Sequence, residues 1–386
     1  MFLSQHQNNK TKKRRKTEQA LLDSLKAALN NRPILSLQDD VIKEAKYQTV
    51  LPLVCSDIEA YPVIASNVQI MWEQQNIVSI LSNIPFIVLK GSCAAVYYPE
   101  PLRRTLGDID VLVSPTHFDS AYKALKEAGY ATNDLLNGKE RHVHFKHGTT
   151  IVELHRRYAV LQDKIQEKML DDWLFHTKPV TGTISKYTFP MPNNELNGLV
   201  LLAHINQHLE QGLGLRHLLD WVMYVKECLP DDKWPSFQEK SDLLGLTTIA
   251  KVVARLGQMY FDINTDRNWC SDANEQTVEN LLDYIFEWGN FGHKDIKNNA
   301  AVMVMSHGRG VKGFFKNLQH QGIHNWTAIN THPYLKLFAW MYQLGRYFKI
   351  GIKSFSIRDF VRNYQSSKNR NRLMDELGAT RLVLRK

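Results

Sequence analysis

The spacing of apolar residues changes twice along this 386-residue chain, and this change constrains the fold more than any other feature. Up to about residue 81 the apolar residues recur at helical spacing. Short β-type runs then follow at 86–89, 108–113, 141–146 and 150–155. Helical patterns at 92–98 and 116–128 separate the earlier runs, and from about residue 193 the pattern is helical almost throughout.

These changes predict an α+β protein in which a small α/β core with a mixed sheet lies between helical extensions. The expected regions are a basic, disordered tail at 1–16, N-terminal helices at 17–82, the core at 83–192 and a large helical C-terminal lobe at 193–386. Long helices of this lobe, following a cap at Asn193 or Asn194, are expected at 195–211, 214–228, 246–261, 275–288 and 333–348.

The charge balance indicates polyanionic partners. A net charge of +9 attracts nucleoside triphosphates, nucleic acid or an anionic membrane face. The basic run at 10–16 is interpreted as a solvated tail, with a nucleic-acid or acidic-surface contact as the alternative. No apolar run is long enough to cross a bilayer. The four cysteines are far apart in the sequence and form no CxxC pair, so we interpret them as reduced thiols. We therefore expect a soluble, cytoplasmic protein without stable membrane insertion.

Two aspartates open the second β-type run and suggest a metal site. Asp108 and Asp110 are two residues apart on a strand, so both project from one face while Ile109 and Val111 face the other way. Two neighbouring carboxylates repel each other unless a cation lies between them. Oxygen ligands without a cysteine favour a hard ion such as Mg²⁺.

The run at 150–155 can supply a third carboxylate. Its alternation places Glu153 and His155 on one face and Val152 and Leu154 on the other. If the preceding strand pairs through a turn at 148–149, Val143 and Phe145 join the apolar face. Glu153 then meets Asp108 and Asp110 if the strands are neighbours, which is the geometry of a two-metal site.

An anion cradle is predicted just before the aspartates. Lys90, Gly91 and Ser92 lie between a strand and the start of a helix, where glycine lets a phosphate approach the backbone and the helix N-terminus presents free N–H groups. Lys90, Arg103 and Arg104 are candidate counter-charges for the phosphates.

Residues 86–156, carrying Lys90-Gly91-Ser92, Arg103-Arg104, Asp108-Ile109-Asp110 and Glu153, resemble a poorly characterised bacterial nucleotidyltransferase family of the polymerase-β-like superfamily. The resemblance implies that Asp108, Asp110 and Glu153 bind two Mg²⁺ ions, with Mn²⁺ as the alternative. It also implies that Gly91 and Ser92 hold the triphosphate, that Lys90 with Arg103 or Arg104 steadies the phosphates, and that Glu153 accepts the acceptor proton.

The implied reaction moves a nucleoside monophosphate from a nucleoside triphosphate, ATP among them, to an unknown acceptor hydroxyl with release of pyrophosphate. A small-molecule or carbohydrate acceptor is favoured over RNA or protein. The alternatives are a nucleotide-binding regulatory module without turnover and a toxin-like transferase that modifies RNA. Neither the oligomeric state nor the preferred base is readable from the sequence.

Four further patterns have competing interpretations. His142, His144 and His155 could ligate zinc near Glu153, but a polar sheet face with His155 hydrogen-bonded to the ligands is preferred. The GxGxxG match at 308–313 is interpreted as a basic loop, because a helical rather than βαβ pattern follows it. Arg216 and Asp220, four apart on a helix, are expected to form an ion pair, with a contact to the nucleotide or acceptor as the alternative. The aromatic and basic residues at 334–352 indicate core packing, with a membrane-surface helix as the alternative.

Overall fold

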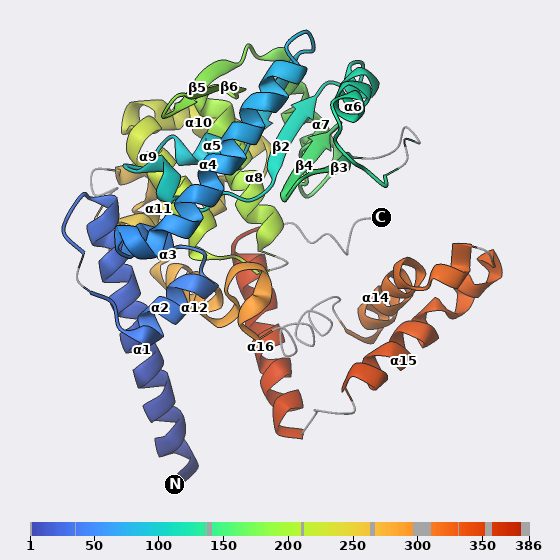
Figure 1. The fold of residues 1–386 in the computed structure, drawn as a ribbon. Coiled ribbons are helices and arrows are strands. Elements are labelled where there is room, and N and C mark those ends of the chain that lie inside the picture. The colour runs from blue at the N-terminus through green and yellow to red at the C-terminus, as the bar shows by residue number, and fades with distance from the viewer. Residues whose placement is uncertain are drawn as a thin grey trace.

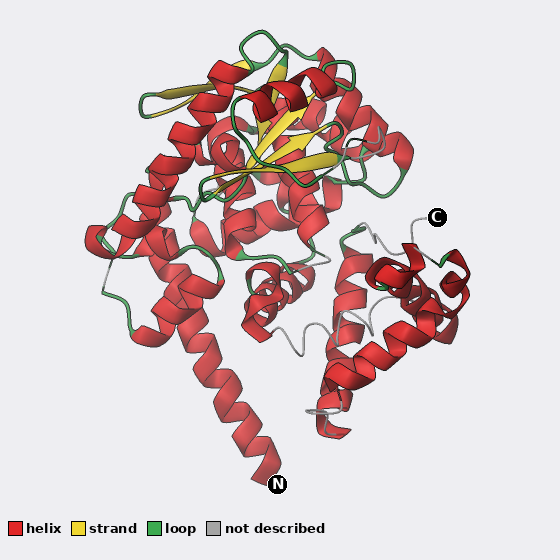
Figure 2. Ribbon diagram, turned by 45° about the vertical axis from the view of Figure 1, so that its right-hand side comes forward, coloured by secondary structure: helices red, strands yellow, loops and turns green. Residues whose placement is uncertain are grey.

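The computed structural model describes residues 2–34, 36–134, 136, 141–209, 212–262, 267–295, 310–330, 332–351 and 357–379. It is an α+β protein in which helices surround a four-stranded sheet and a separate two-stranded hairpin (Figures 1 and 2). The fold class predicted from the sequence is therefore confirmed.

The sheet is mixed, and its strand order brings two segments of the core side by side. The order is β1 (Phe86–Leu89), β2 (Ile109–Val113), β4 (Thr150–His155) and β3 (His142–His147). The pairs β1–β2 and β3–β4 are antiparallel, whereas β2 and β4 are parallel. The short helices α5 (Gly91–Ala95) and η1 (Pro101–Arg103) precede β2, and α6 (Phe118–Glu127) follows it.

Four helices precede the sheet. They are α1 (Phe2–Leu29), α2 (Asp39–Tyr47), α3 (Leu51–Val54) and α4 (Asp57–Ile80). The basic run at 10–16 lies within α1, which projects away from the body of the molecule towards the N-terminus (Figure 2). A capping box starts α4, because the Ser56 side chain accepts from the Glu59 N–H while the Glu59 carboxylate accepts from Ser56.

After the sheet, α7 (Lys164–His176) leads into a hairpin of β5 (Val180–Ile184) and β6 (Tyr187–Met191) that the sequence did not predict. The turn between its strands places Ser185 at a φ of 55°. Tyr187 and Phe189 are buried with Met71 of α4 and Val88 of β1, so the hairpin covers the edge of the molecule beside β1.

The C-terminal lobe is helical, as predicted. The helices up to residue 295 are α8 (Asn194–His208), α9 (Leu215–Cys228), η2 (Asp231–Lys233), α10 (Trp234–Leu243), α11 (Thr247–Phe261), η3 (Asn268–Cys270), α12 (Glu275–Trp288) and η4 (Asn290–Asp295). Beyond them lie α14 (Gly310–Asn325), η5 (Thr327–Asn330), η6 (Pro333–Phe338), α15 (Ala339–Gly351) and α16 (Ile357–Glu376). Asn193 caps α8, because its side chain accepts from the Leu196 N–H at 3.0 Å.

The segment that contains α14 and α15 includes part of the GxGxxG match. The helices α14 and α15 pack against each other and stand apart from the sheet (Figure 1). Of the GxGxxG match, Gly310 to Gly313 lie in the first turn of α14, so this part is helical rather than a loop. Residues 301–309 lie outside the described part of the chain.

The two faces of the sheet are buried against different partners. Val143, Phe145, Val152 and Leu154 are at most 1% exposed and pack with Phe118 of α6, as the alternation predicted. On the opposite face, apolar residues such as Leu89 and Leu112 join the large core of the helical lobe. The face that carries Asp110 and Glu153 is therefore turned towards the helical lobe.

In the described part of the chain no helix combines the length and apolarity needed to span a membrane. Cys55, Cys93, Cys228 and Cys270 are all free thiols.

Candidate active site

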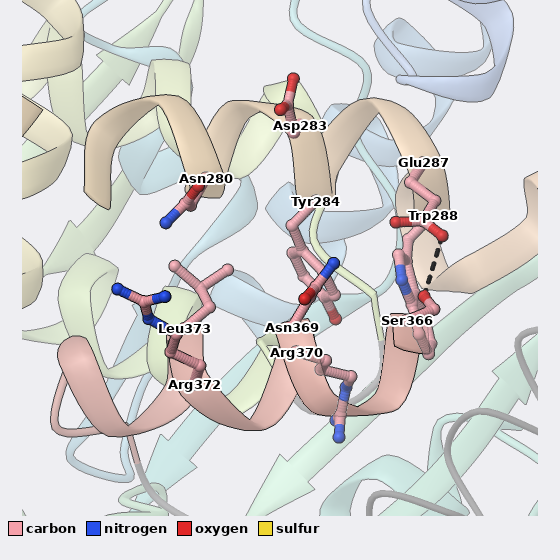
Figure 3. A pocket seen from close by; sticks show the side chains of 10 residues that line it. All are labelled: Asn280, Asp283, Tyr284, Glu287, Trp288, Ser366, Asn369, Arg370, Arg372 and Leu373. Carbon is pink, nitrogen blue, oxygen red and sulfur yellow. Dashed lines mark hydrogen bonds between the residues drawn. The ribbon is translucent and has the colours of Figure 1, made fainter. Parts of the chain in front are cut away.

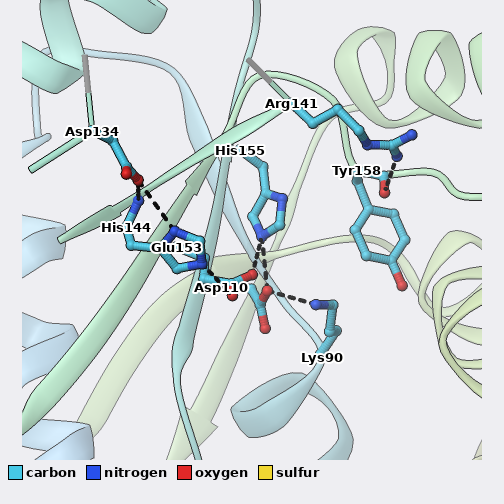
Figure 4. A network of polar contacts seen from close by, with 8 residues as sticks. All are labelled: Lys90, Asp110, Asp134, Arg141, His144, Glu153, His155 and Tyr158. Atoms are coloured by element: carbon cyan, nitrogen blue, oxygen red, sulfur yellow. Dashed lines mark hydrogen bonds and ion pairs between the residues drawn. The ribbon is translucent and has the colours of Figure 1, made fainter. Parts of the chain in front are cut away.

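Two carboxylates meet across the parallel pair of strands. Asp110 of β2 and Glu153 of β4 are register partners, so their side chains leave the same face of the sheet at the same level. Asp110 is almost completely buried, at 2% exposure, whereas the Glu153 side chain is 19% exposed. Figure 4 shows both side chains converging with those of Lys90 and His155. The predicted proximity of Glu153 to Asp110 is therefore present in the structure.

A continuous polar network joins these groups. Lys90 Nζ donates to Asp110 Oδ1 at 2.6 Å, and His155 Nε2 lies 2.8 Å from the same oxygen. His155 Nε2 is also 3.2 Å from Glu153 Oε2, while His144 Nε2 lies 3.3 Å from Glu153 Oε1 (Figure 4). Asp110 is therefore held by two cationic or donor groups, and each Glu153 oxygen lies beside one histidine, His144 or His155.

The network sets the protonation of its members. Burial alone would raise the pKa of Asp110, but Lys90 and His155 outweigh it and hold this pKa at about 2. Burial would likewise raise the pKa of Glu153, yet the hydrogen bond from His155 lowers it below its usual value. For His155 burial opposes the charged form, but hydrogen bonds to Asp110 and Glu153 raise its pKa. Both carboxylates are therefore ionised at neutral pH.

Asp108 stands at the mouth of this cluster rather than inside it. It immediately precedes β2 and is exposed, unlike Asp110. Desolvation by the surrounding protein, followed by the negative charge of Asp110, nevertheless raises the pKa of Asp108, and Glu153 adds to the effect. The three predicted carboxylates thus share one electrostatic environment, with Asp108 on the solvent side.

Lys90 has a backbone conformation that glycine usually occupies. Its φ is 54° and its ψ is −122°, at the junction of β1 and α5. A non-glycine residue in such a region costs about 1–3 kcal/mol, which the surrounding contacts must offset. The ammonium group is fixed by Asp110 and lies 5.5 Å from the centroid of the buried Tyr158 ring. Such strain is concentrated at functional sites in proteins.

The predicted cradle is only partly available. A Cβ added to Gly91 would meet the Asp108 carbonyl at 3.8 Å and Leu106 at 3.9 Å, so the protein itself does not require glycine there. The Ser92 hydroxyl is buried and donates to Gln74 Oε1 at 2.8 Å. Because α5 has five residues, its dipole is short. A glycine that its protein neighbours do not require remains the strongest feature of the cradle.

The two arginines expected near the phosphates are engaged elsewhere. Arg103 pairs with Asp57 and Glu100 and donates to the Pro52 carbonyl, which ties η1 to α3 and α4. Arg104 is 3% exposed and forms a two-pronged ion pair with the buried Asp220 of α9. These contacts support a structural role for both residues and give no support to a phosphate contact.

The predicted ion pair between Arg216 and Asp220 is corrected by the structure. The helical pair of Arg216 with Asp220 is not among the ion pairs of the described residues, because Asp220 accepts instead from Arg104 and from the Tyr98 hydroxyl at 2.9 Å. Arg216 donates to the Thr105 carbonyl at 3.2 Å. Burial and the nearby Arg104 charge lower the pKa of Arg216 to about 10, while Asp108 raises it. Arg216 is therefore a cation near the exposed aspartate.

The donors around Asp110 suit a hard divalent ion. Among the described residues, Asp110, Glu153 and His155 have ligand atoms within 4.8 Å of one another, and so do His142, His144 and Glu153. Carboxylate oxygens from neighbouring strands, with Asp108 at the opening, match the preference of Mg²⁺ for oxygen. His155 lies against both carboxylates, in the position from which a histidine orients the ligands of a metal.

A groove elsewhere on the protein contains none of these groups. It lies between α12 and α16, where Glu287 accepts from the Ser366 hydroxyl at 2.9 Å and the Arg370 guanidinium lies 5.4 Å from the Trp288 ring centroid (Figure 3). Its walls are charged and amide side chains that join the two helices. We assign it to interhelical packing.

Comparison with known proteins gives one family match. The sequence model of a family described as an uncharacterised nucleotidyltransferase matches residues 59–262, which include α4 from its third residue, the whole four-stranded sheet and α8 to α11. No curated protein matches the chain, and no solved structure does. All of the residues in the polar network lie inside the matched segment.

Proposed function

Because this chain belongs to the uncharacterised nucleotidyltransferase family, we propose that it moves a nucleoside monophosphate from a nucleoside triphosphate to an acceptor hydroxyl. The observation that carries the proposal is the register of Asp110 with Glu153 on parallel strands, with Gly91 two residues beyond Leu89, the β1 residue that pairs with Asp110. In the reaction the acceptor oxygen forms a bond to the α-phosphorus, the bond to the β-phosphate oxygen breaks, and pyrophosphate leaves.

Asp108, Asp110 and Glu153 would hold divalent ions, for which we propose Mg²⁺, with Mn²⁺ as the alternative. Bound there, such ions neutralise the charge that develops on the attacking and leaving oxygens. His155 keeps the two inner carboxylates ionised and oriented.

The chain's own cations and backbone would position the triphosphate. Without a side chain, Gly91 would let a phosphate oxygen approach the backbone, and the neighbouring Lys90, which is paired with Asp110, would add a positive charge. Arg216 is better placed than Arg103 or Arg104 to add a second positive charge, because it lies near Asp108 and its guanidinium makes a single side-chain hydrogen bond.

The acceptor proton needs a base on the open side of the cluster. Asp110 is buried and held by Lys90 and His155, whereas Glu153 is partly exposed. We therefore propose that Glu153 accepts the proton of the acceptor hydroxyl. The acceptor would enter between the core at 83–192 and the lobe that begins at residue 193, and a small-molecule or carbohydrate hydroxyl in the cytoplasm is the acceptor we favour.

The test combines labelled nucleotides with matched aspartate variants. The protein is incubated with Mg²⁺, each α-labelled nucleoside triphosphate and a cell extract, and transfer of label and release of pyrophosphate are measured. Asp108→Asn and Asp110→Asn should abolish both signals while circular dichroism stays unchanged. Asp119→Asn is the control, because Asp119 is 76% exposed on α6 and pairs with Arg156.

The outcomes separate the competing functions. Full activity in both active-site variants would refute the assignment of the carboxylates. Thermal stabilisation by nucleotides without any label transfer would indicate a regulatory module. Label transferred to RNA, with an acceptor affinity that falls steeply as salt rises, would indicate an RNA-modifying transferase.

A further inference from the structure

A second cluster of potential ligands lies in the helical lobe, outside the carboxylate site. His204 and His208 are four residues apart on α8 and therefore share one helical face, and His217 lies in the first turn of α9. Ligand atoms of the three rings lie within 4.8 Å of one another. The ring centroids are 4.5 Å apart for His204 and His208, 4.9 Å for His204 and His217, and 4.5 Å for His208 and His217.

Three ring nitrogens of this cluster are buried without a hydrogen-bond partner among the described residues. His217 is 1% exposed and neither of its ring nitrogens makes a hydrogen bond to the described part of the chain, where Nδ1 of His208, at 7% exposure, has no partner either. Buried polar side-chain atoms are nearly always satisfied in proteins, so unpaired nitrogens that converge call for a ligand. Apolar side chains would fill this space equally well, so packing alone does not explain why three histidines lie here.

All three rings are held in the form that binds a metal. Burial, followed by the proximity of His208 and His217, lowers the pKa of His204 far below its usual value. Burial and then the charges of Lys90 and Arg216 lower the pKa of His208 to about 3. The pKa of His217 is also lowered strongly, by burial and then by the proximity of His208 and Arg216. Neutral imidazole is the species that coordinates metal ions.

The positive groups near the cluster have negative neighbours of their own. Lys90 is paired with Asp110 at 2.6 Å. Arg216 is influenced by Asp220 and by Asp108, and both carboxylates raise its pKa. Asp110 raises the pKa of His208, so this carboxylate offsets part of the positive field of the two cations at the cluster.

We propose that His204, His208 and His217 form a three-histidine site for Zn²⁺ at the junction of α8 and α9. Three imidazoles without a carboxylate select a borderline ion such as zinc over Mg²⁺. Zinc with three histidines takes bonds of about 2.0–2.1 Å and leaves a fourth position for water or substrate. The nitrogens would need to close to about 3.3 Å from one another, which ring rotations can supply.

Residues next to the three histidines bound the proposed zinc site on two sides. Phe291 of η4 forms an apolar wall, with its ring centroid 4.9 Å from that of His208. This wall is fixed against the turn before α9, because the Phe291 N–H donates to the Gly212 carbonyl at 3.0 Å. The backbone of Gly214 raises the pKa of His217, so its carbonyl is a candidate acceptor for the second ring nitrogen of a zinc-bound His217. His204 is partly exposed and provides the open side.

The proposal can be tested separately from the nucleotidyltransferase reaction. The two other clusters of possible ligands among the described residues both contain Glu153, so a Glu153→Gln background weakens both. In that background the protein is loaded with Zn²⁺, dialysed against buffer, and its metal content is measured. We expect one zinc per chain, loss of this zinc in His217→Phe and in His208→Phe, and retention in His176→Gln. His176 is an exposed histidine on α7 whose Nδ1 donates to the Asp172 carbonyl at 2.7 Å.

Metal-edge X-ray absorption on the zinc-loaded full-length chain gives a second readout that does not depend on variants folding. Three imidazole ligands support the site. Zinc content below one-tenth of an equivalent, retention of the full equivalent in both histidine variants, or coordination dominated by oxygen would overturn it.

Discussion

The buried pair of Arg104 and Asp220 offers a direct test of whether Arg104 is a structural residue or a phosphate ligand. The side chains are 3% and 2% exposed, and Asp220 also accepts from the Tyr98 hydroxyl. Asp220→Ala would leave the Arg104 charge buried without a partner. Breaking one side of such a pair costs about 3–5 kcal/mol, which is a large part of the about 5–15 kcal/mol that stabilises a typical protein.

The expected result is a loss of about 3–5 kcal/mol in the free energy of unfolding. It can be measured by urea denaturation followed by tryptophan fluorescence, because the buried Trp221 is adjacent to Asp220. The matched control is Glu127→Ala, which breaks the exposed pair of Lys123 and Glu127 with side chains 76% and 67% exposed. That change should cost less than about 0.5 kcal/mol.

A double variant isolates the charge from the packing. Arg104→Met combined with Asp220→Leu removes both charges and should recover much of the stability lost in Asp220→Ala, because paired apolar substitutes are often tolerated. The Tyr98 hydroxyl would remain without its acceptor, at a cost of about 1–3 kcal/mol. A loss below about 1 kcal/mol in Asp220→Ala, or an Arg104→Met protein of normal stability that no longer binds nucleotide, would refute the structural role.

Three further predictions concern the carboxylate site. In metal-free protein, the lowered pKa of Asp110 gives stability that is complete above about pH 4 and is lost as the pH falls towards 2; Lys90→Met should shrink this loss in acid unfolding curves and abolish turnover. Gly91→Ala should fold normally, since its new Cβ makes contacts no closer than 3.8 Å, yet raise the dissociation constant for nucleotide in calorimetry. His155→Gln should lower kcat or metal affinity by about 10–100-fold with little change in the far-ultraviolet spectrum.

The acidic site could be inferred from the sequence because strand alternation is local information. The period of two placed Glu153 opposite the apolar Val152 and Leu154, and the register of β2 with β4 then brought Glu153 beside Asp110. The hairpin of β5 and β6 escaped prediction because Gly182 and Pro190 weaken the strand pattern, since neither residue is favoured inside a sheet.

The partners of the basic residues could not be inferred in the same way. Asp220 lies 116 residues from Arg104, and a helical spacing of four favoured its pairing with Arg216 instead. The fold decides between the two arginines, because Arg104 reaches Asp220 from η1 with two nitrogens. His204 and His208 show a helical spacing, but only the start of α9 brings His217 to them. Contacts across elements therefore carry the part of the site that sequence patterns miss.

The same contacts explain why the site lies where core and lobe meet. Two buried groups of the core find their partners in the lobe. Arg104 donates to Asp220, and the Cys93 carbonyl accepts from the amide of Asn197 at 2.9 Å. Each of these groups would cost free energy if it were buried without its partner. We therefore infer that the core and the first helices of the lobe fold as one unit. Those shared contacts are made by Cys93 of α5 and by Arg104, so they also hold in place the two segments that precede the proposed metal ligands Asp108 and Asp110.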